Sequence, residues 1–103
     1  AAAPVPQIKD SKEQRRLDAQ ARQQLADKAR PLKKELEQID KRLATLAAER
    51  AELEARLTQP LPPAEIADCG KRLKQGQDET ENLEERWLEI STALEEMGAS
   101  TPA

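Results

Sequence analysis

Residues 31–57 read PLKKELEQIDKRLATLAAERAELEARL, and the spacing of their apolar side chains decides the fold. From Leu25 onward, seam positions recur at alternating steps of four and three, which is the heptad pattern of a coiled coil. With one charged exception they are apolar: Leu25, Ala29, Leu32, Leu36, Ile39, Leu43, Leu46, Arg50, Leu53 and Leu57. A second arm repeats the spacing with Ile66, Cys69, Leu73, Gly76, Thr80, Leu83, Trp87, Ile90, Leu94 and Met97. The two arms predict two long helices that pack through their seams.

A proline-rich turn, Thr58-Gln59-Pro60-Leu61-Pro62-Pro63, separates the two arms. Its prolines interrupt a helix, because each lacks an amide donor and clashes with the preceding turn. Pro63 suits the first position of the following helix. Since so short a connection makes neighbouring helices antiparallel, the sequence predicts an all-α fold, an antiparallel two-helix coiled-coil hairpin.

The heptad seam weakens upstream of Leu25, where only Leu17 and Ala21 continue it, at steps of four. Pro31 is a second interruption, which predicts either a kink or the start of the main helix after a shorter one. The hairpin is therefore expected to carry a kinked or separate N-terminal helical extension. The expected segments are a disordered linker at 1–10, helices at about 11–29, 31–58 and 64–97, a turn at 59–63 and a disordered tail at 98–103, with Gly98 as the C-cap.

Two registers of the hairpin are open. If partner residue numbers sum to 126, Arg50 faces Gly76, so that the longest seam side chain meets the position without one. That register pairs Leu32 with Leu94, Leu36 with Ile90, Ile39 with Trp87, Leu43 with Leu83, Leu46 with Thr80, Leu53 with Leu73 and Leu57 with Cys69. A sum near 122–123 places Leu46 by Gly76, tightens the turn and brings together Glu35 with Arg86, Arg42 with Glu79 and Glu49 with Arg72. Exposed ion pairs contribute only ~0–1 kcal/mol each, so we expect the register of 126.

The seam also predicts the core and the oligomeric state. The most buried side chains are expected to be Leu36, Ile39, Leu43, Leu83, Trp87 and Ile90, with Trp87 as the main anchor. Cys69 occupies a core position and is expected to be a small buried hydrophobe. Because the hairpin closes its own seam, we expect a monomer.

Composition excludes most catalytic functions. The 103 residues make one domain, with no His and a single Cys, so metal sites built on His and thiol–imidazole pairs are absent. Paired glutamates such as Glu84-Glu85 lie on a solvated helix face, where no acid–base role follows. We expect a non-catalytic chain without a cofactor. No stretch is long and apolar enough to span a membrane, and no signal peptide precedes the fold, so a cytoplasmic location is expected.

Charge is distributed unevenly along the chain. Residues 9–34 hold nine Lys/Arg and four Asp/Glu, whereas residues 79–97 hold one Arg and seven Glu. The basic segment is a candidate phosphate-binding strip, comprising Lys9, Lys12, Arg15, Arg16, Arg22, Lys28, Arg30, Lys33 and Lys34. A second candidate group near the turn comprises Arg56, Lys71, Arg72 and Lys74. The alternative interpretation is that the basic and acidic segments neutralise each other at the open end of the hairpin.

The second arm contains Leu83-Glu84-Glu85-Arg86-Trp87-Leu88-Glu89, followed by Leu94-Glu95-Glu96-Met97. This resembles the ending of the C-terminal domain of ABC-F proteins, which are ATPases of the ABC superfamily without membrane spans and include Uup-like and YheS-like members. The first arm agrees, since Lys12-Glu13-Gln14-Arg15-Arg16 and the Arg30-Pro31-Leu32 stretch resemble the family's basic entry and its proline before the coiled coil.

The resemblance implies a detached C-terminal domain whose partners are upstream ATP-binding cassettes of the same chain. ATP and Mg²⁺ would belong to those cassettes, because no Gly-rich phosphate loop occurs here. ABC-F proteins act on ribosomes in translation, and the coiled coil of Uup-like members is associated with DNA binding. The resemblance therefore implies electrostatic binding of DNA or ribosomal RNA.

Two alternatives stay open at this stage. One is a protein-interaction or intramolecular regulatory coiled coil without nucleic-acid binding. The other is a tRNA-binding arm like the antiparallel hairpin of seryl-tRNA synthetase.

Overall fold

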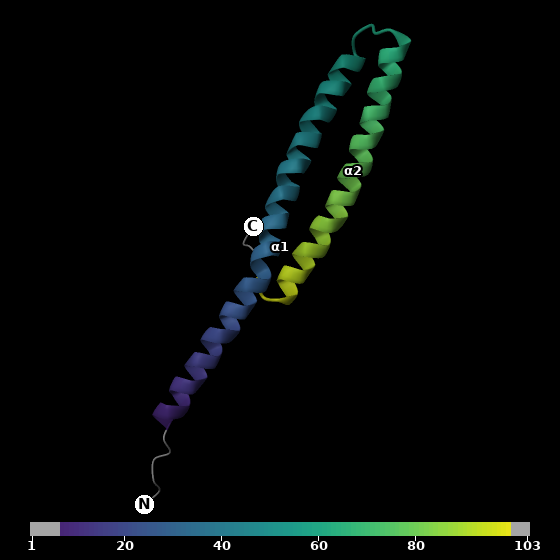
Figure 1. Cartoon of the computed structure of the whole chain (residues 1–103). Helices are drawn as coiled ribbons and strands as arrows, with labels where there is room; N and C mark the ends of the chain where they lie inside the picture. The colour runs from purple at the N-terminus through teal and green to yellow at the C-terminus, as the bar shows by residue number, and fades with distance from the viewer. Residues whose placement is uncertain (1–6, 100–103) are drawn as a thin grey trace, which may run out of the picture.

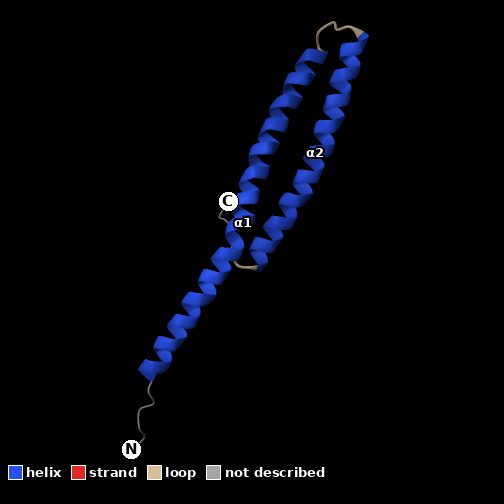
Figure 2. Cartoon of the chain, viewed as in Figure 1, coloured by secondary structure: helices blue, strands red, loops and turns tan. Residues whose placement is uncertain are grey.

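A computed structural model describes the backbone of residues 7–99 and the side chains of residues 11–99. It contains two helices, α1 (Gln7–Leu57) and α2 (Pro63–Glu96). They run antiparallel and side by side, and the described residues contain no strand (Figures 1 and 2). The prediction of an all-α two-helix hairpin is confirmed. The parts of the expected linker and tail at residues 1–6 and 100–103 lie outside the described residues, while residues 7–10 are already helical.

Short hydrogen-bonded turns close both ends of α2. Before it, the Pro62 carbonyl accepts hydrogen bonds from the amides of Glu65 and Ile66, at 3.0 and 3.1 Å. After it, Gly98 adopts a left-handed conformation with φ of 69°, and the Ala99 amide donates to the Leu94 carbonyl at 2.8 Å. This is the geometry of a Schellman motif, and it confirms Gly98 as the residue that terminates the helix.

α1 runs through Pro31 without a break, so the separate helices expected at 11–29 and 31–58 are one helix of 51 residues. Proline at this position removes the donor that would otherwise bond the Asp27 carbonyl. Both Pro31 and Asp27 are exposed, so water is available to the freed carbonyl. The packing of Ala29 and Leu32 against α2 on the opposite side of the helix holds the chain helical across the proline.

The register expected from the sequence is wrong, and the alternative is correct. The interhelix ion pairs Arg86–Glu35, Arg42–Glu79, Arg72–Glu49 and Arg56–Glu65 all have residue numbers that sum to 121. Gly76 faces Leu46, whose Cδ2 lies 4.0 Å from the position that a Gly76 Cβ would occupy. Arg50 needs no facing void, because its side chain is 70% exposed and binds Glu54 at 2.9 Å.

The turn accounts for this register. α1 ends at Leu57 and α2 begins at Pro63, so the hairpin reverses around residue 60. A sum of 126 would place the reversal at Pro63, inside α2, which is incompatible with helix at that residue. The proline-rich turn therefore outweighs the match of Arg50 to Gly76.

The core is a thin seam of small and aliphatic residues. Its buried members are Ala29, Ile39, Leu46, Leu53, Cys69, Ile90 and Leu94. This confirms Ile39, Ile90 and Cys69, whereas Leu36, Leu43 and Leu83 are half-buried and pack against the cluster. Trp87 was expected to anchor the seam, and that prediction is wrong, because the side chain is 37% exposed. Two helices offer each seam residue one partner surface, which covers Ile90 but leaves part of an indole in water.

Candidate nucleic-acid interface

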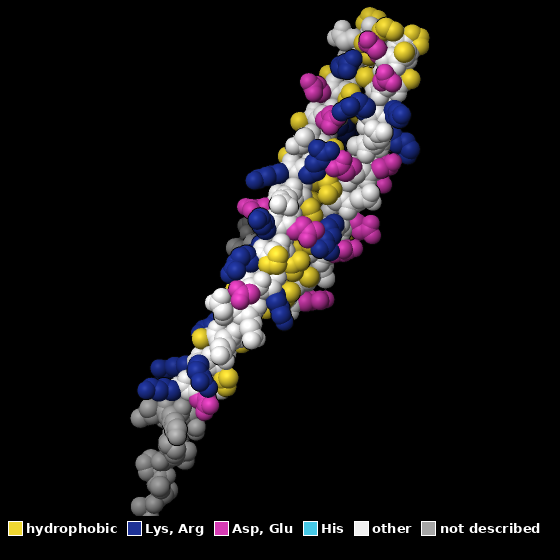
Figure 3. All heavy atoms as spheres, in the orientation of Figure 1, with side chains coloured by type: hydrophobic (Ala, Val, Ile, Leu, Met, Phe, Trp, Pro, Cys, Tyr) yellow, Lys and Arg dark blue, Asp and Glu magenta, His cyan; other side chains and the backbone are white. Residues whose placement is uncertain are grey.

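The basic N-terminal part of α1 extends beyond the end of α2 (Figure 1). In the observed register the last residues of α2 lie opposite residue 25 or so, which leaves residues 11–24 without a neighbouring helix. Every side chain in this stretch is exposed. Figure 3 shows Lys and Arg gathered on the described end of this extension, below the alternating charges of the hairpin.

Most of the predicted basic residues share one side of α1. At 3.6 residues per turn, seven of them fall within an arc of about 120° that flanks the seam. We call this set the basic face; it comprises Lys12, Arg15, Arg16, Arg22, Arg30, Lys33 and Lys34, all exposed. Lys28 lies outside the arc, toward the side that carries the interhelix ion pairs. The side chain of Lys9 lies outside the described residues.

Neighbouring acids neutralise little of the basic face. Arg16 pairs with Glu13 at 3.6 Å and Arg30 with Asp27 at 3.3 Å, each three residues away on the same helix. These pairs are exposed, and such contacts are weak. Among the side chains of residues 11–99, no ion pair joins a cation between Lys12 and Lys34 to the acidic segment 79–97. The interpretation that the two segments neutralise each other therefore finds no ion pair to support it in this part of the chain.

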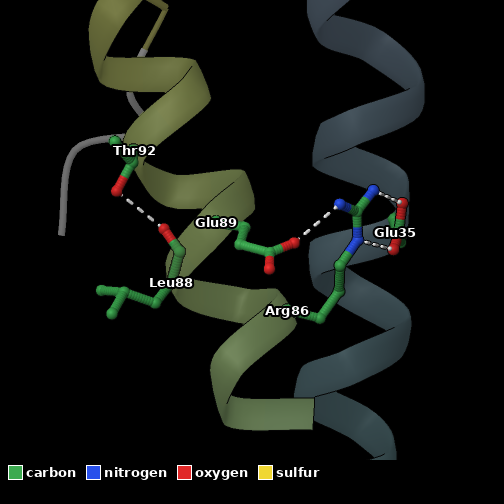
Figure 4. A network of polar contacts seen from close by, with 5 residues as sticks. All are labelled: Glu35, Arg86, Leu88, Glu89 and Thr92. Atoms are coloured by element: carbon green, nitrogen blue, oxygen red, sulfur yellow. Dashed lines mark hydrogen bonds and ion pairs between the residues drawn. The ribbon is translucent and has the colours of Figure 1, made fainter. Parts of the chain in front are cut away.

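The arginine of the acidic segment serves the hairpin itself (Figure 4). Arg86 donates two hydrogen bonds to the Glu35 carboxylate, at 2.7 and 3.0 Å, and a third to Glu89 at 3.2 Å. Two parallel N–H···O bonds give the pair a defined geometry. Leu88 points away from α1 in the same view, and its side chain is 62% exposed.

The interhelix ion pairs also shift the pKa values of their members. The hydrogen bond from Arg86 lowers the pKa of the Glu35 carboxyl, and that from Arg42 lowers the pKa of Glu79. The same bonds raise the pKa of Arg86 and Arg42, and the contact with Glu49 raises the pKa of Arg72. Hydrogen bonding to the charged form is the cause in each case. In the folded state these ion pairs therefore favour the charged form of each member.

Most members of the predicted basic group near the turn form ion pairs, unlike most members of the basic face. Arg72 pairs with Glu49 across the hairpin, and Arg56 lies 3.8 Å from Glu65. Lys74 lies 3.8 Å from Asp78 on its own helix. In the described structure only Lys71 of this group has no ion-pair partner. The turn group therefore acts mainly within the hairpin, and the basic face of α1 is the stronger candidate interface.

A groove between the helices was not anticipated. It has a volume of about 450 Å³ and lies around Gly76, where Leu46, Ala47, Leu73 and Thr80 line it. Gly76 and Thr80 are small seam residues, so the spacing and size of seam residues was the signal that could have indicated a gap. The side chains of residues 11–99 contain no cluster of His, Cys, Asp or Glu that suits a metal ion. Neither α1 nor α2 has an apolar stretch that could cross a membrane.

Comparison with known proteins agrees with this geometry. Residues 27–92, which cover most of the hairpin, match the sequence profile of the ABC transporter C-terminal domain. Searches of curated proteins and of solved structures returned no match. The resemblance to the C-terminal domain of ABC-F proteins is confirmed, and the chain belongs to the ABC transporter C-terminal domain family.

Proposed function

We propose that this domain binds nucleic acid through the basic face of α1, by contacts to phosphate and without recognition of bases. The observation that carries the proposal is the exposed set of seven cations on one side of a helix that projects past its partner. Lys and Arg side chains on an exposed helix are the usual donors to phosphate oxygens. The basic face carries no aromatic side chain, so stacking on bases adds nothing.

The acidic end of α2 limits how nucleic acid can approach. Glu84, Glu85, Glu95 and Glu96 are exposed and repel phosphate from that part of the hairpin. The basic face of α1 stays accessible, because all seven of its cations are exposed. DNA and ribosomal RNA are both candidates, since phosphate contacts do not discriminate between them.

We further propose that the domain is a non-catalytic module that works attached to the ATP-binding cassettes of a longer protein. Membership of the family supports this arrangement, since its name refers to the C-terminal part of ABC proteins. ATP and Mg²⁺ would bind to the cassettes, and the hairpin would supply contacts to nucleic acid.

Fluorescence anisotropy with a labelled 20-base-pair DNA and a ribosomal RNA stem tests the binding. With four to six phosphates neutralised, the logarithm of affinity should fall with the logarithm of salt at a slope of about −4 to −5. Arg15→Glu with Arg16→Glu should reduce the slope by about 2. The matched control, Lys28→Glu with Arg50→Glu, changes net charge equally but lies off the basic face, and it should bind nearly as wild type. If the wild-type domain does not bind at low salt and high micromolar concentration, the proposal is wrong.

A second candidate function, binding of a protein, is favoured by the exposed Trp87 and Leu88. Neighbouring exposed apolar residues are common at protein contacts. Leu88→Ser should weaken such a contact and leave nucleic-acid binding unchanged.

A further inference from the structure

The basic face contains an internal repeat. Lys12, Arg15 and Arg16 form a first cationic trio, and Arg30, Lys33 and Lys34 form a second. Each member of the first trio lies 18 residues before its counterpart in the second. Eighteen residues make five full turns of an α-helix, so counterparts point in the same direction, and they are separated by about 27 Å along the axis.

The unbroken course of α1 sets this spacing. The helix continues through Pro31, which lies between Arg30 and Lys33 of the second trio. The second trio is also held by the hairpin, because neighbouring Ala29 is only 2% exposed and packs in the core cluster with Leu94. The first trio lies on the extension beyond α2. The two trios therefore lie on either side of the end of α2, on one continuous helix.

The surface between the trios is suited to close approach. Ala19, Gln23 and Ala26 occupy the centre of the same arc, and all three are uncharged and exposed. Arg22 lies at the edge of the arc. Within the arc no acidic residue lies between the trios, and the nearest carboxylate is that of Asp27, which lies just outside the arc and pairs with Arg30 at 3.3 Å. A rigid ligand can therefore lie along the arc and contact both trios.

Building on the proposed function, we propose that the ligand is a double helix held at two points, one at each trio. A duplex is stiff and presents phosphates at regular intervals, so contact at one trio places further phosphates near the other and raises their effective concentration. At about 3.4 Å per base pair, 27 Å corresponds to roughly 8 base pairs. A single strand is flexible and must be ordered before it can contact both trios.

Binding of short and long duplexes tests the two-point contact. The nearest members of the two trios, Arg16 and Arg30, are about 21 Å apart along the helix axis. A three-base-pair DNA stem closed by a short loop is too small to span this distance and reaches one trio, whereas a 20-base-pair duplex reaches both. The association constant of each duplex is divided by the number of positions at which the domain can bind along it. By this measure the wild-type domain should bind the longer duplex at least about tenfold more tightly. DNA and RNA duplexes of both lengths, and a 20-nucleotide single strand, separate the possible ligands.

A relocation variant separates geometry from net charge. Lys12→Glu with Glu13→Lys, and Arg15→Asp with Asp18→Arg, keep the composition of charge but move two cations of the first trio off the basic face. This variant should lose the preference for the long duplex and retain binding to the short one. The matched exchange Lys74→Asp with Asp78→Lys leaves both trios intact and should retain the preference. Circular dichroism should show equal helicity for all variants.

Four results would overturn the inference. A wild-type domain that binds short and long duplexes equally, or single strands as tightly as duplexes, contradicts the two-point contact but leaves the proposed function standing. If the relocation variant retains the preference for the long duplex, the two-point contact is likewise contradicted and the proposed function stands. Failure to bind any of these nucleic acids removes the proposed function, and the inference fails with it.

Discussion

Residues 11–24 and residues 25–57 belong to the same helix, but they differ in burial and in the use of their charges. The first stretch has no buried side chain, whereas the second contributes four residues to the core, Ala29, Ile39, Leu46 and Leu53. In the packed stretch, Glu35, Arg42 and Glu49 bind partners on α2. In the extension, the described ion pair is local, between Glu13 and Arg16.

The extension is supported by local interactions. Gln14 donates to Asp18 at 3.0 Å and Gln23 to Asp27 at 3.1 Å, each across one turn. Pairs of this kind add only about 0.2–0.5 kcal/mol each, and isolated helices of this length are marginal in water. The comparison shows that charged residues of the packed stretch form ion pairs between the helices, whereas the extension leaves its cations available to a ligand.

The largest effect is expected from the core of the hairpin. Ile90→Ala removes a side chain that is 1% exposed and should lower the free energy of unfolding by about 2–5 kcal/mol. Leu17→Ala, in the half-exposed equivalent on the extension, should change it by less than about 0.5 kcal/mol. Urea unfolding followed by circular dichroism measures both. Similar losses from the two variants would contradict the difference in burial.

Pro31→Ala should stabilise the helix where the extension joins the hairpin. An interior proline costs about 3 kcal/mol relative to alanine, and the added freedom of the unfolded chain offsets about 0.4–1 kcal/mol of that. We expect a net gain of about 2 kcal/mol in the same urea experiment. Hydrogen exchange should slow at amides near residue 31, whereas a loss of stability would show that the proline has a favourable structural role.

Trp87→Ala sharpens the comparison inside the hairpin. Because the indole is partly in water, its removal should lower the free energy of unfolding by about 2 kcal/mol, less than the ~3–5 kcal/mol of a fully buried ring. A loss larger than that of Ile90→Ala would restore Trp87 as the anchor. Tryptophan fluorescence of the wild type should also show an emission maximum intermediate between buried and exposed indole.

Acid should weaken the hairpin and leave the extension nearly unaffected. The pKa values of Glu35 and Glu79 are lowered in the folded state, so their contribution is complete above the ordinary glutamate pKa of about 4.3. It is lost as pH falls through the lower folded-state pKa. The urea midpoint should decrease between pH 6 and pH 3, and Glu35→Gln with Glu79→Gln should flatten this decrease. An unchanged pH profile in the double variant would show that other carboxylates dominate.

Heptad spacing and the proline turn were sufficient to predict the hairpin and the position of Cys69 in the core, and the glycine at position 98 was sufficient to predict the turn that terminates α2. Apolar periodicity was insufficient for the register, because both seams repeat every seven residues and more than one offset pairs them. Apolar periodicity also predicted too much burial for Trp87. A seam position indicates which way a side chain faces, but it does not indicate whether the partner helix is large enough to cover that side chain.

The two groups of cations were visible in the sequence, but which of their members form ion pairs within the hairpin required the structure. Arg56 and Arg72 are opposite glutamates only in the observed register. The basic face of α1 depends on the helix continuing through Pro31, which local propensity opposed and packing against α2 permitted.

The sequence by itself determined that the chain is helical, that it reverses at Pro60–Pro63 and that apolar seams join its arms. These features are local, because they depend on backbone donors, proline rings and the spacing of side chains along one helix. Tertiary structure alone decided the offset of the arms, the exposure of Trp87 and the length of α1 that projects beyond α2. Those features depend on how two surfaces fit together and on where the turn allows them to meet, and neither property belongs to any single segment.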